Sequence, residues 1–301
     1  MNMEKRIIEC VPNFSEGRNP ARIDRIVEAF RAKEGVKLLD YSSDFDHNRM
    51  VVTVAGRPAA IAGAVLEAIG IAVELIDLNA HSGVHPRMGA VDVVPFIPLG
   101  GCSMDEAVDL SREVAREAGQ RFGLPVFLYE KSASAPHRVN LADVRKGGFE
   151  GLDSKLSLPQ WKPDFGPGYK HPTAGAVAIG ARSPLVAYNV NLDTDRIDVA
   201  RAIARKLRYS SGGLRYCKAM GVELKTRGTV QVSMNMTDYS RTSLYQAFEL
   251  VKLEARRYGV TVAGSEIIGL VPMEAIADVA GYYLGLEDFS LRQVLEARLW
   301  E

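Results

Sequence analysis

The order of strand-like and helix-like patterns in the first third of the chain returns in its last third, and this repetition limits the folds available. β-Branched and apolar runs alternate with segments whose apolar residues recur at helical spacing. The first copy predicts strands at 7–11, 36–39, 50–54 and 91–98, with helices opening at Asn19 and Pro58. The second copy predicts strands at 185–192, 217–224, 229–236 and 261–268, with helices opening at Asp195 and Ser243.

Each copy therefore reads strand, helix, strand, strand, helix, strand, which is the split β-α-β arrangement. A sheet covered by helices on one side must still bury its other face, and two such sheets can cover one another. We expect an α/β (α+β) protein of two ferredoxin-like β-α-β-β-α-β subdomains, with facing sheets and helices outside. The copies share no matching residues, so this prediction rests on the pattern alone.

Additional elements are expected between the copies. Ser103 and Glu106 form a capping-box pattern for a helix that runs to about residue 122, and 125–129 predicts a strand. The segment 149–175 lacks periodicity and is rich in proline, glycine and aromatic residues. Flexible linkers lack large aromatics, so we expect this segment to be packed and to form a ligand wall between two domains. The predicted subdomains are 1–182 and 183–301.

Net charge and cysteine spacing limit the classes of protein to which the chain can belong. Lys+Arg and Asp+Glu both number 37 among 301 residues, and a chain without a basic excess is not expected to bind nucleic acid or an anionic membrane. Cys10, Cys102 and Cys217 are far apart, which predicts neither a disulfide framework nor a zinc site. The most apolar stretch, 59–78, contains two glutamates and reads as an ordinary helix. The early charges of the N-terminus do not fit a secretory signal, so we expect a soluble cytoplasmic protein.

The most informative local segment is 80–92, because two glycines and a proline within it oppose regular structure. A long polar loop in a compact domain usually carries function. Two of the five histidines, His81 and His85, lie in this loop. Imidazole is the side chain that exchanges protons near neutral pH without a shifted pKa. We therefore interpret the loop as the catalytic centre.

The two histidines of this loop have alternative interpretations. His81 and His85 have the spacing at which two helical histidines share a metal ion, but the glycine between them and the proline after them oppose a helix. Metal binding is therefore the weaker interpretation, and no metal is expected. One of the two is expected to bond a backbone carbonyl instead. We assign the chemistry to His85, with Arg87 and Asp92 orienting its ring or balancing its charge.

Two other polar segments adjoin predicted strands. Asp40 and Arg49 flank strand ends, where side chains converge on a shared cleft, whereas the residues between them read as an exposed hairpin turn. The segment 13–18 precedes the first helix, and its backbone amides can hold an anion there. No nucleotide-binding glycine motif follows any strand, and Ser15 lacks the context of a serine nucleophile.

With these residues in view, the chain resembles the glutamate formimidoyltransferases, which form the transferase half of formiminotransferase-cyclodeaminase. The resemblance covers nearly the whole chain. Its motifs are ECVPNFSEG at 9–17, HPRMG at 85–89 with Asp92 after it, PFIP at 95–98, PDFGP at 163–167 and NVNL at 189–192. Each motif alone is a weak signal, but together they are highly specific.

The resemblance implies transfer of a formimino group from N-formimino-L-glutamate to N5 of tetrahydrofolate, a co-substrate, in histidine degradation. It places the catalytic histidine at His85 and implies a dimer with its substrates at the junction of two facing sheets. The family's folate-binding segment falls on 166–175, with the pterin along 161–169. The residues we expect at the folate are Asp164, Phe165, Gly166, Pro167, Gly168, Tyr169, Lys170, His171, Pro172, Thr173, Ala174 and Gly175.

The chemistry assigns roles to further residues. A carboxylate, Asp40 or Asp92, should stabilise the positive charge of the amidinium. The glutamate carboxylates require cationic partners, and the candidates are Arg49, Arg87 and Arg182.

The resemblance also has two departures. A family relative has an acidic residue at the position of Ser42, so any orienting role passes to Asp40, Asp44 or Asp92. The cyclodeaminase half does not appear before Glu301, so a separate cyclodeaminase is expected to process the product.

Three alternatives remain open at this point. The same fold could transfer a formyl group, using N-formylglutamate or 5-formyltetrahydrofolate, because the donors differ only in NH against O. A folate-binding protein without turnover would not need a base at His85. A metal-dependent amidohydrolase would require stoichiometric zinc.

Overall fold

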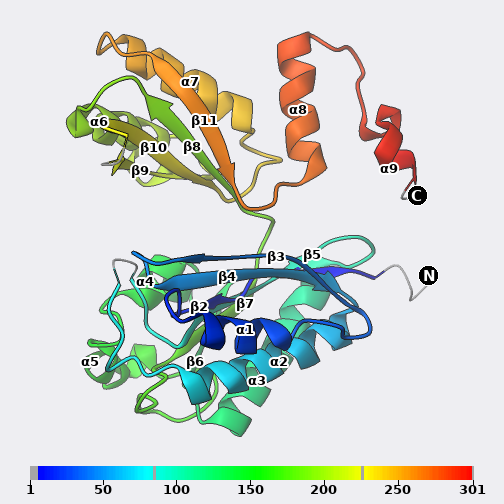
Figure 1. The fold of residues 1–301 in the computed structure, drawn as a ribbon, viewed down its shortest axis with the longest axis vertical. Helices are drawn as coiled ribbons and strands as arrows, with labels where there is room; N and C mark the ends of the chain where they lie inside the picture. Colours follow the sequence, from blue (N-terminus) through cyan, green and yellow to red (C-terminus); the bar gives the residue numbers. More distant parts are fainter. Residues whose placement is uncertain (1–5, 84–85, 225–226, 300–301) are drawn as a thin grey trace. The chain divides into compact units, whose positions relative to one another are not determined.

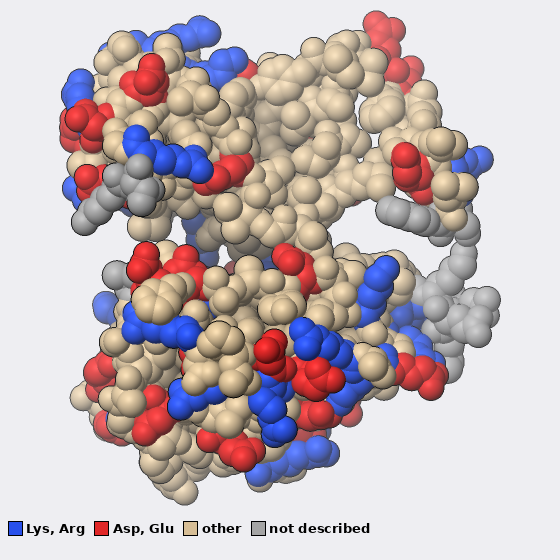
Figure 2. Space-filling view, viewed as in Figure 1, with Lys and Arg blue, Asp and Glu red and all other residues tan. Residues whose placement is uncertain are grey.

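The chain forms two compact units, Met1–Arg182 and Ser183–Glu301, in a computed structural model that describes residues 6–83, 86–224 and 227–299 (Figure 1). Each unit has its own sheet and its own hydrophobic core. Basic and acidic side chains are interspersed over the first unit on the face that Figure 2 shows, without an expanse of one sign.

The sheet of the first unit contains the predicted β-α-β-β-α-β order. Its antiparallel part runs β3, β4, the β1/β2 pair and β5, and the sheet then continues through parallel strands β7 and β6. The strands are β1 (Ile8–Cys10), β2 (Asn13–Phe14), β3 (Val36–Asp44), β4 (Arg49–Gly56), β5 (Val91–Pro98), β6 (Val126–Glu130) and β7 (Val177–Ala181).

Three helices cover one face of this sheet (Figure 1): α1 (Pro20–Glu28), α2 (Pro58–Leu75) and α3 (Met104–Phe122). Their starts follow the expected caps, since the Asn19 side chain accepts from the backbone N–H of Arg22 and the capping box before α3 is complete. By length and composition α2 could cross a membrane, but its apolar side chains lie in the core of the unit. The expectation of an ordinary helix there is confirmed.

The strands present two different faces. In β4 the side chains of Met50, Val52 and Val54 are buried in the core under the helices. Because strand side chains alternate, Arg49 and Thr53 belong to the opposite face. The face away from α1–α3 is therefore the one that carries polar groups of β4.

The second unit has a four-stranded antiparallel sheet in the order β11, β8, β10, β9, which is that of the ferredoxin-like fold. Its strands are β8 (Val186–Leu192), β9 (Cys217–Leu224), β10 (Thr229–Met236) and β11 (Val262–Ile268). Its helices are α6 (Ile197–Leu207), α7 (Leu244–Arg256), α8 (Met273–Leu284) and α9 (Leu295–Leu299). The duplicated pattern is thus confirmed in both units.

The structure differs from the prediction at several elements. Pro12 lies where the first strand divides into β1 and β2, because proline cannot donate to a sheet ladder. Strand β3 runs to Asp44 instead of residue 39, and α6 begins at Ile197 instead of Asp195. The sequence analysis missed β7, α8 and α9. Further short elements are α4 (Leu141–Arg145), α5 (Leu152–Leu156) and 3-10 turns at Pro136–Arg138, Pro159–Trp161, Tyr209–Ser211 and Leu291–Gln293.

The aperiodic segment 149–175 is packed, as its aromatic residues predict. The buried guanidinium of Arg138 donates to the carbonyl oxygens of Gln160 and Lys162, at 2.8 and 2.6 Å, and pairs with Asp164 at 2.7 Å. The Trp161 ring meets that of Phe127 edge-on, with centroids 6.1 Å apart. These contacts attach the segment to β6 within the first unit.

Substitution of two glycines of the first unit is expected to change its stability in opposite directions. A Cβ at Gly89 would lie 1.9 Å from the carbonyl oxygen of Ala176, whereas a Cβ at exposed Gly63 in α2 would meet no atom within 4 Å. We expect Gly89→Ala to lower the free energy of unfolding by about 1–3 kcal/mol, and Gly63→Ala to raise it by about 0.5–1 kcal/mol. Urea unfolding of both variants measures this, and a Gly89→Ala protein as stable as the wild type would contradict it.

Candidate functional site

The histidine loop and the proposed folate segment lie against each other in the first unit. The backbone N–H of Leu78 donates to Thr173 O at 2.9 Å, and that of Ala90 donates to Ala174 O at 2.9 Å. In the other direction, the N–H of Ala176 donates to Met88 O at 3.0 Å. The two stretches that sequence analysis assigned to catalysis and to folate, about 90 residues apart in the chain, are therefore joined by backbone hydrogen bonds.

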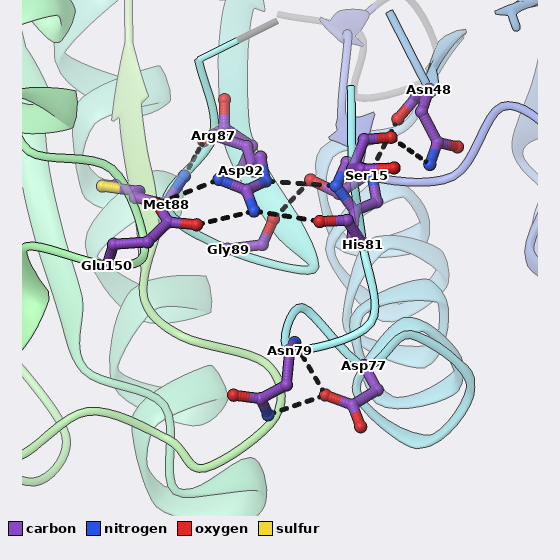
Figure 3. Close-up of polar contacts among 11 residues, drawn as sticks. Ser15, Asn48, Asp77, Asn79, His81, Arg87, Met88, Gly89, Asp92 and Glu150 are labelled. Carbon is purple, nitrogen blue, oxygen red and sulfur yellow. Dashed lines mark hydrogen bonds and ion pairs between the residues drawn. The ribbon is translucent and has the colours of Figure 1, made fainter. Parts of the chain in front are cut away.

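His85, the predicted base, lies outside the described residues, together with Val84. The described residues of the loop before and after these two are held by hydrogen bonds to other parts of the first unit. His81 contacts Asn48 on one side, and Met88 is hydrogen-bonded to Asp92 on the other (Figure 3).

His81 is held as a neutral imidazole. Its Nε2 lies 2.9 Å from the carbonyl oxygen of Asn48, and its Nδ1 accepts from Arg87 Nε at 3.1 Å (Figure 3). Nε2 therefore carries the proton. Burial lowers the pKa of His81 below its ordinary value, and the charge of Arg87 lowers it further, against the hydrogen bond to Asn48, which raises it. His81 is the loop histidine that bonds a backbone carbonyl.

Arg87 is engaged by groups of the chain itself. Its Nη1 and Nη2 contact the two carboxylate oxygens of Glu150, at 3.1 and 2.9 Å (Figure 3). Nη2 also donates to the His81 carbonyl oxygen at 3.2 Å. This bidentate pair positions the loop and leaves Arg87 little capacity for a substrate carboxylate.

Asp92 is a buried carboxylate at the start of β5, with 2% of its surface exposed. Oδ1 accepts from the backbone N–H of Met88 at 2.9 Å, and Oδ2 lies 2.5 Å from Nη2 of Arg145 in α4. Oδ1 therefore holds the end of the histidine loop through a hydrogen bond, whereas Oδ2 has the ion-pair contact with Arg145 and no hydrogen-bond partner among the described residues. Sequence analysis missed Arg145, since nothing in the α4 sequence indicates where its side chain would reach.

Arg49 lies close to this pair. Its Nη2 donates to the side-chain oxygen of buried Asn13 in β2. Burial lowers the pKa of Arg49 to about 10, the charge of Arg145 lowers it further, and that of Asp92 raises it. The sequence prediction that Arg49 binds the glutamate of the substrate stays a prediction.

Asn48 is a junction that sequence analysis did not single out. It has a φ of +48° in the turn between β3 and β4 and is buried. Its Oδ1 accepts from the N–H of Gly17 at 2.9 Å, and its Nδ2 donates to Ser82 O at 3.0 Å. Asparagine tolerates this left-handed conformation, so its position in the turn was the available signal.

The expectation that free amides of 13–18 hold an anion is wrong. The carboxylate of Glu16 already accepts from the N–H groups of Arg18 and Asn19, at 2.9 and 3.0 Å, and pairs with Arg22 at 3.2 Å. The anion at the start of α1 is therefore a side chain of the protein. A cavity of about 520 Å³ opens beside this group and His81.

The remaining acidic candidates, Asp40 and Asp44, lie on β3. Asp40 is exposed on β3 and pairs in register with Thr53, about 13 Å along β4 from Arg49. Asp44 accepts from the N–H of His47 at 2.7 Å, and this bond lowers its pKa more than any other cause. Asp44 therefore serves the turn.

Arg182 lies at the end of β7, where its backbone N–H donates to Phe96 O at 3.0 Å. Its charge acts on Glu9 in β1, whose pKa burial raises and Arg182 lowers. Arg182 thus belongs to the polar surroundings of β1.

The proposed folate segment has fixed and exposed parts. Asp164 Oδ2 accepts from the N–H of Leu128 at 2.8 Å and pairs with Arg138, so it holds the segment in place. Lys170 pairs with Asp153 at 2.7 Å. Tyr169 is 70% exposed, and its ring is available for a flat ligand.

The NVNL motif forms a polar cluster in the second unit. Asn189 and Asn191 point to the same face of β8, because side chains alternate along a strand. Gln231 Nε2 donates to Asn191 Oδ1 at 2.8 Å and to Glu266 Oε1 at 2.7 Å, and Asn189 Nδ2 donates to the same oxygen at 3.4 Å. The motif therefore supports a side-chain network as well as a strand.

Among residues 6–83, 86–224 and 227–299, no three His, Cys, Asp or Glu side chains are grouped as a metal site would require. The three cysteines are free thiols.

Known proteins match the chain over both units. A model of the formiminotransferase domain's N-terminal subdomain matches residues 7–182, and a model of the formiminotransferase domain matches residues 187–297. The chain is 53% identical to the glutamate formimidoyltransferase of Streptococcus pyogenes serotype M1, covering 98% of this chain and 99% of that protein. It is 45% identical to the glutamate formimidoyltransferase of Thermoplasma acidophilum, covering 97% of each chain. The formimidoyltransferase-cyclodeaminase of Sus scrofa is 40% identical, and the match covers 96% of this chain and 54% of that protein.

The lowered pKa of His81 predicts how stability depends on pH. Above pH 7.5 the imidazole is neutral in both states and contributes no dependence. As the pH falls through about 6.5, the unfolded chain binds a proton that the folded chain does not, so the free energy of unfolding falls. The loss levels off once the pH is below the folded pKa.

Urea unfolding between pH 8 and 5 measures this loss. His81→Gln keeps a donor for Asn48 O without a titrating group, so we expect a shallower decline relative to its own value at pH 8. His171, whose pKa burial also lowers, contributes the remaining decline with the same sign. An unchanged slope in His81→Gln would refute the neutral buried state of His81.

Proposed function

Because this chain belongs to the formiminotransferase family, we propose that it transfers the formimino group of N-formimino-L-glutamate to N5 of tetrahydrofolate and releases L-glutamate. One structural observation carries the proposal: the backbone of the histidine loop is bonded to Ala174 of the proposed folate segment and to Ala176 directly after that segment. This contact supports a site where a base and a pterin ring meet.

The reaction requires a proton shuttle. N5 attacks the formimino carbon, and the new C–N bond leaves a positive charge on N5. A base must take the N5 proton before the tetrahedral intermediate reverts, and the glutamate nitrogen must gain a proton as its C–N bond breaks. One imidazole with a pKa near 7 can perform both transfers. We assign this role to His85, because His81 is held neutral by contacts on both of its ring nitrogens.

The carboxylates take different roles in this proposal. Asp92 acts through position, because its oxygens hold the N–H of Met88 and the guanidinium of Arg145. The amidinium role of Asp40 stays a prediction from the sequence, because Asp40 is exposed on β3 about 13 Å along β4 from Arg49.

The substrates are assigned to neighbouring parts of the site. Residues 164–175 take tetrahydrofolate, with Tyr169 and the backbone around Gly166 against the pterin. Arg49 and Arg182 take the glutamate of the donor. Arg87, which Glu150 already binds, is the weakest of the three arginine candidates.

Two assembly proposals follow from the family. The relatives from Sus scrofa and Rattus norvegicus are named formimidoyltransferase-cyclodeaminases. Their names support a cyclodeaminase as the enzyme that consumes the product. The homodimer stays a prediction, for which light scattering of the purified protein is the test.

A direct assay tests the reaction and its donor. The purified chain is incubated with tetrahydrofolate and either N-formimino-L-glutamate or N-formyl-L-glutamate, and the folate product is identified by its absorbance and mass. We expect 5-formiminotetrahydrofolate and free glutamate from the first donor. Product from the formyl donor alone would favour formyl transfer, and tight folate binding without any product would favour a binding protein.

The role of the base predicts the effect of its removal. We expect His85→Ala to lower kcat by at least about 100-fold while the affinity for tetrahydrofolate changes only a few-fold. His47→Ala, the same change at an exposed histidine of the β3–β4 turn, serves as control and should keep its activity. Near-normal turnover in His85→Ala would remove the proposed base.

A further inference from the structure

Arg145 of the first unit pairs with the buried carboxylate of Asp92, and a second arginine, Arg49, lies within electrostatic range of both. Arg145 has 17% and Asp92 has 4% of its side-chain surface exposed, and their closest atoms are 2.5 Å apart. The charges of Asp92 and Arg145 both act on Arg49, whose side chain donates to the neutral side chain of Asn13. This group, the Arg49–Asp92–Arg145 cluster, carries one positive charge more than it has negative charges.

The cluster also has unused donors. The Nε–H groups of Arg49 and Arg145 are buried and have no hydrogen-bond partner among the residues that the structure describes. A buried donor without a partner is costly, and so is a buried cation that no anion balances. The cluster is therefore suited to accept one anion with acceptor oxygens.

The geometry restricts the class of that anion. Guanidinium groups present planar forks of N–H donors that match a carboxylate. We propose that Arg49 and Arg145 together bind one carboxylate of the glutamate portion of the donor, with Asp92 positioning Arg145. This inference rests on the proposed function, and it gives Arg145 the role that Arg87 cannot fill.

The cluster is connected to the histidine loop through Asp92. The same carboxylate that holds Arg145 also holds the N–H of Met88, three residues after His85. A carboxylate bound at the cluster would thus place a short amino acid beside the loop that carries the base. Tetrahydrofolate also ends in a glutamate, so a test must separate the two sources of the carboxylate.

Truncated substrates combined with variants provide that test. The donors are N-formimino-L-glutamate, N-formimino-L-norvaline, which lacks the distal carboxylate, and N-formimino-4-aminobutyrate, which lacks the α-carboxylate. For the wild type, we expect loss of the bound carboxylate to lower kcat/KM by about 30-fold or more. In Arg145→Gln the same loss should cost less than about 3-fold, because its partner is already absent.

Further variants separate recognition from folding. Arg145→Lys keeps the charge beside Asp92 but loses the planar fork, so we expect normal stability with a raised KM for the donor. Arg49→Lys should behave similarly. Arg121→Gln, an exposed arginine of α3 paired with Glu117, is the matched control and should leave both KM values unchanged.

The outcomes are distinct. Equal costs of donor truncation in the wild type and in Arg145→Gln would overturn the proposal. So would an Arg145→Lys protein that raises the KM for tetrahydrofolate alone, or an Arg145→Gln protein in which removing the glutamate of tetrahydrofolate, as tetrahydropteroate, no longer costs activity. Absence of any formimino transfer by the wild type would instead refute the proposed function itself.

Discussion

The arrangement of the first unit depends on the buried carboxylate of Asp92. A buried charge is stable only if it is compensated, and here a backbone N–H bonds one oxygen of Asp92 while the guanidinium of Arg145 forms an ion pair with the other. The same two bonds tie the end of a glycine- and proline-interrupted loop to β5 and draw α4 toward the sheet. The loop buries Met88 and Ala90 in the core of the unit. Its other described contacts are with this carboxylate, with Asn48, and with the backbone of residues 173–176.

The repeated β-α-β-β-α-β order could be predicted because its signal is local. Apolar periodicity, Asn19, Pro58 and the Ser103 capping box each act within one or two turns of chain. The elements outside this repeat were harder to predict from the sequence. Strand β7 is only five residues long and follows a segment without periodicity, and it is a strand because it lies parallel between β5 and β6. That parallel pairing is a tertiary property, which no window of sequence contains.

The site was predictable only in part. Segments 80–92 and 164–175 were recognisable from composition and motif, and their joining depends on backbone atoms that every residue type has. Asn48 and Arg145 act across 34 and 53 residues of chain, on Ser82 and Asp92. Their residue types were ordinary for a turn and for a short helix. The prediction of an anion site at 13–18 failed because the segment supplies its own anion: the carboxylate of Glu16 accepts from the backbone there.

Charge balance, rather than position in a motif, distinguishes the arginines of the site. Arg87 lies within the HPRMG motif, yet Glu150 neutralises it with a bidentate pair and His81 occupies its Nε. Arg145 has one carboxylate partner, Asp92, and Arg49 donates to the neutral Asn13; both arginines keep a buried Nε–H donor. An arginine that the protein has already neutralised fixes structure, whereas a partly buried cation in excess favours an incoming anion. For a substrate with two carboxylates, an arginine whose charge the protein has not neutralised can contribute binding free energy.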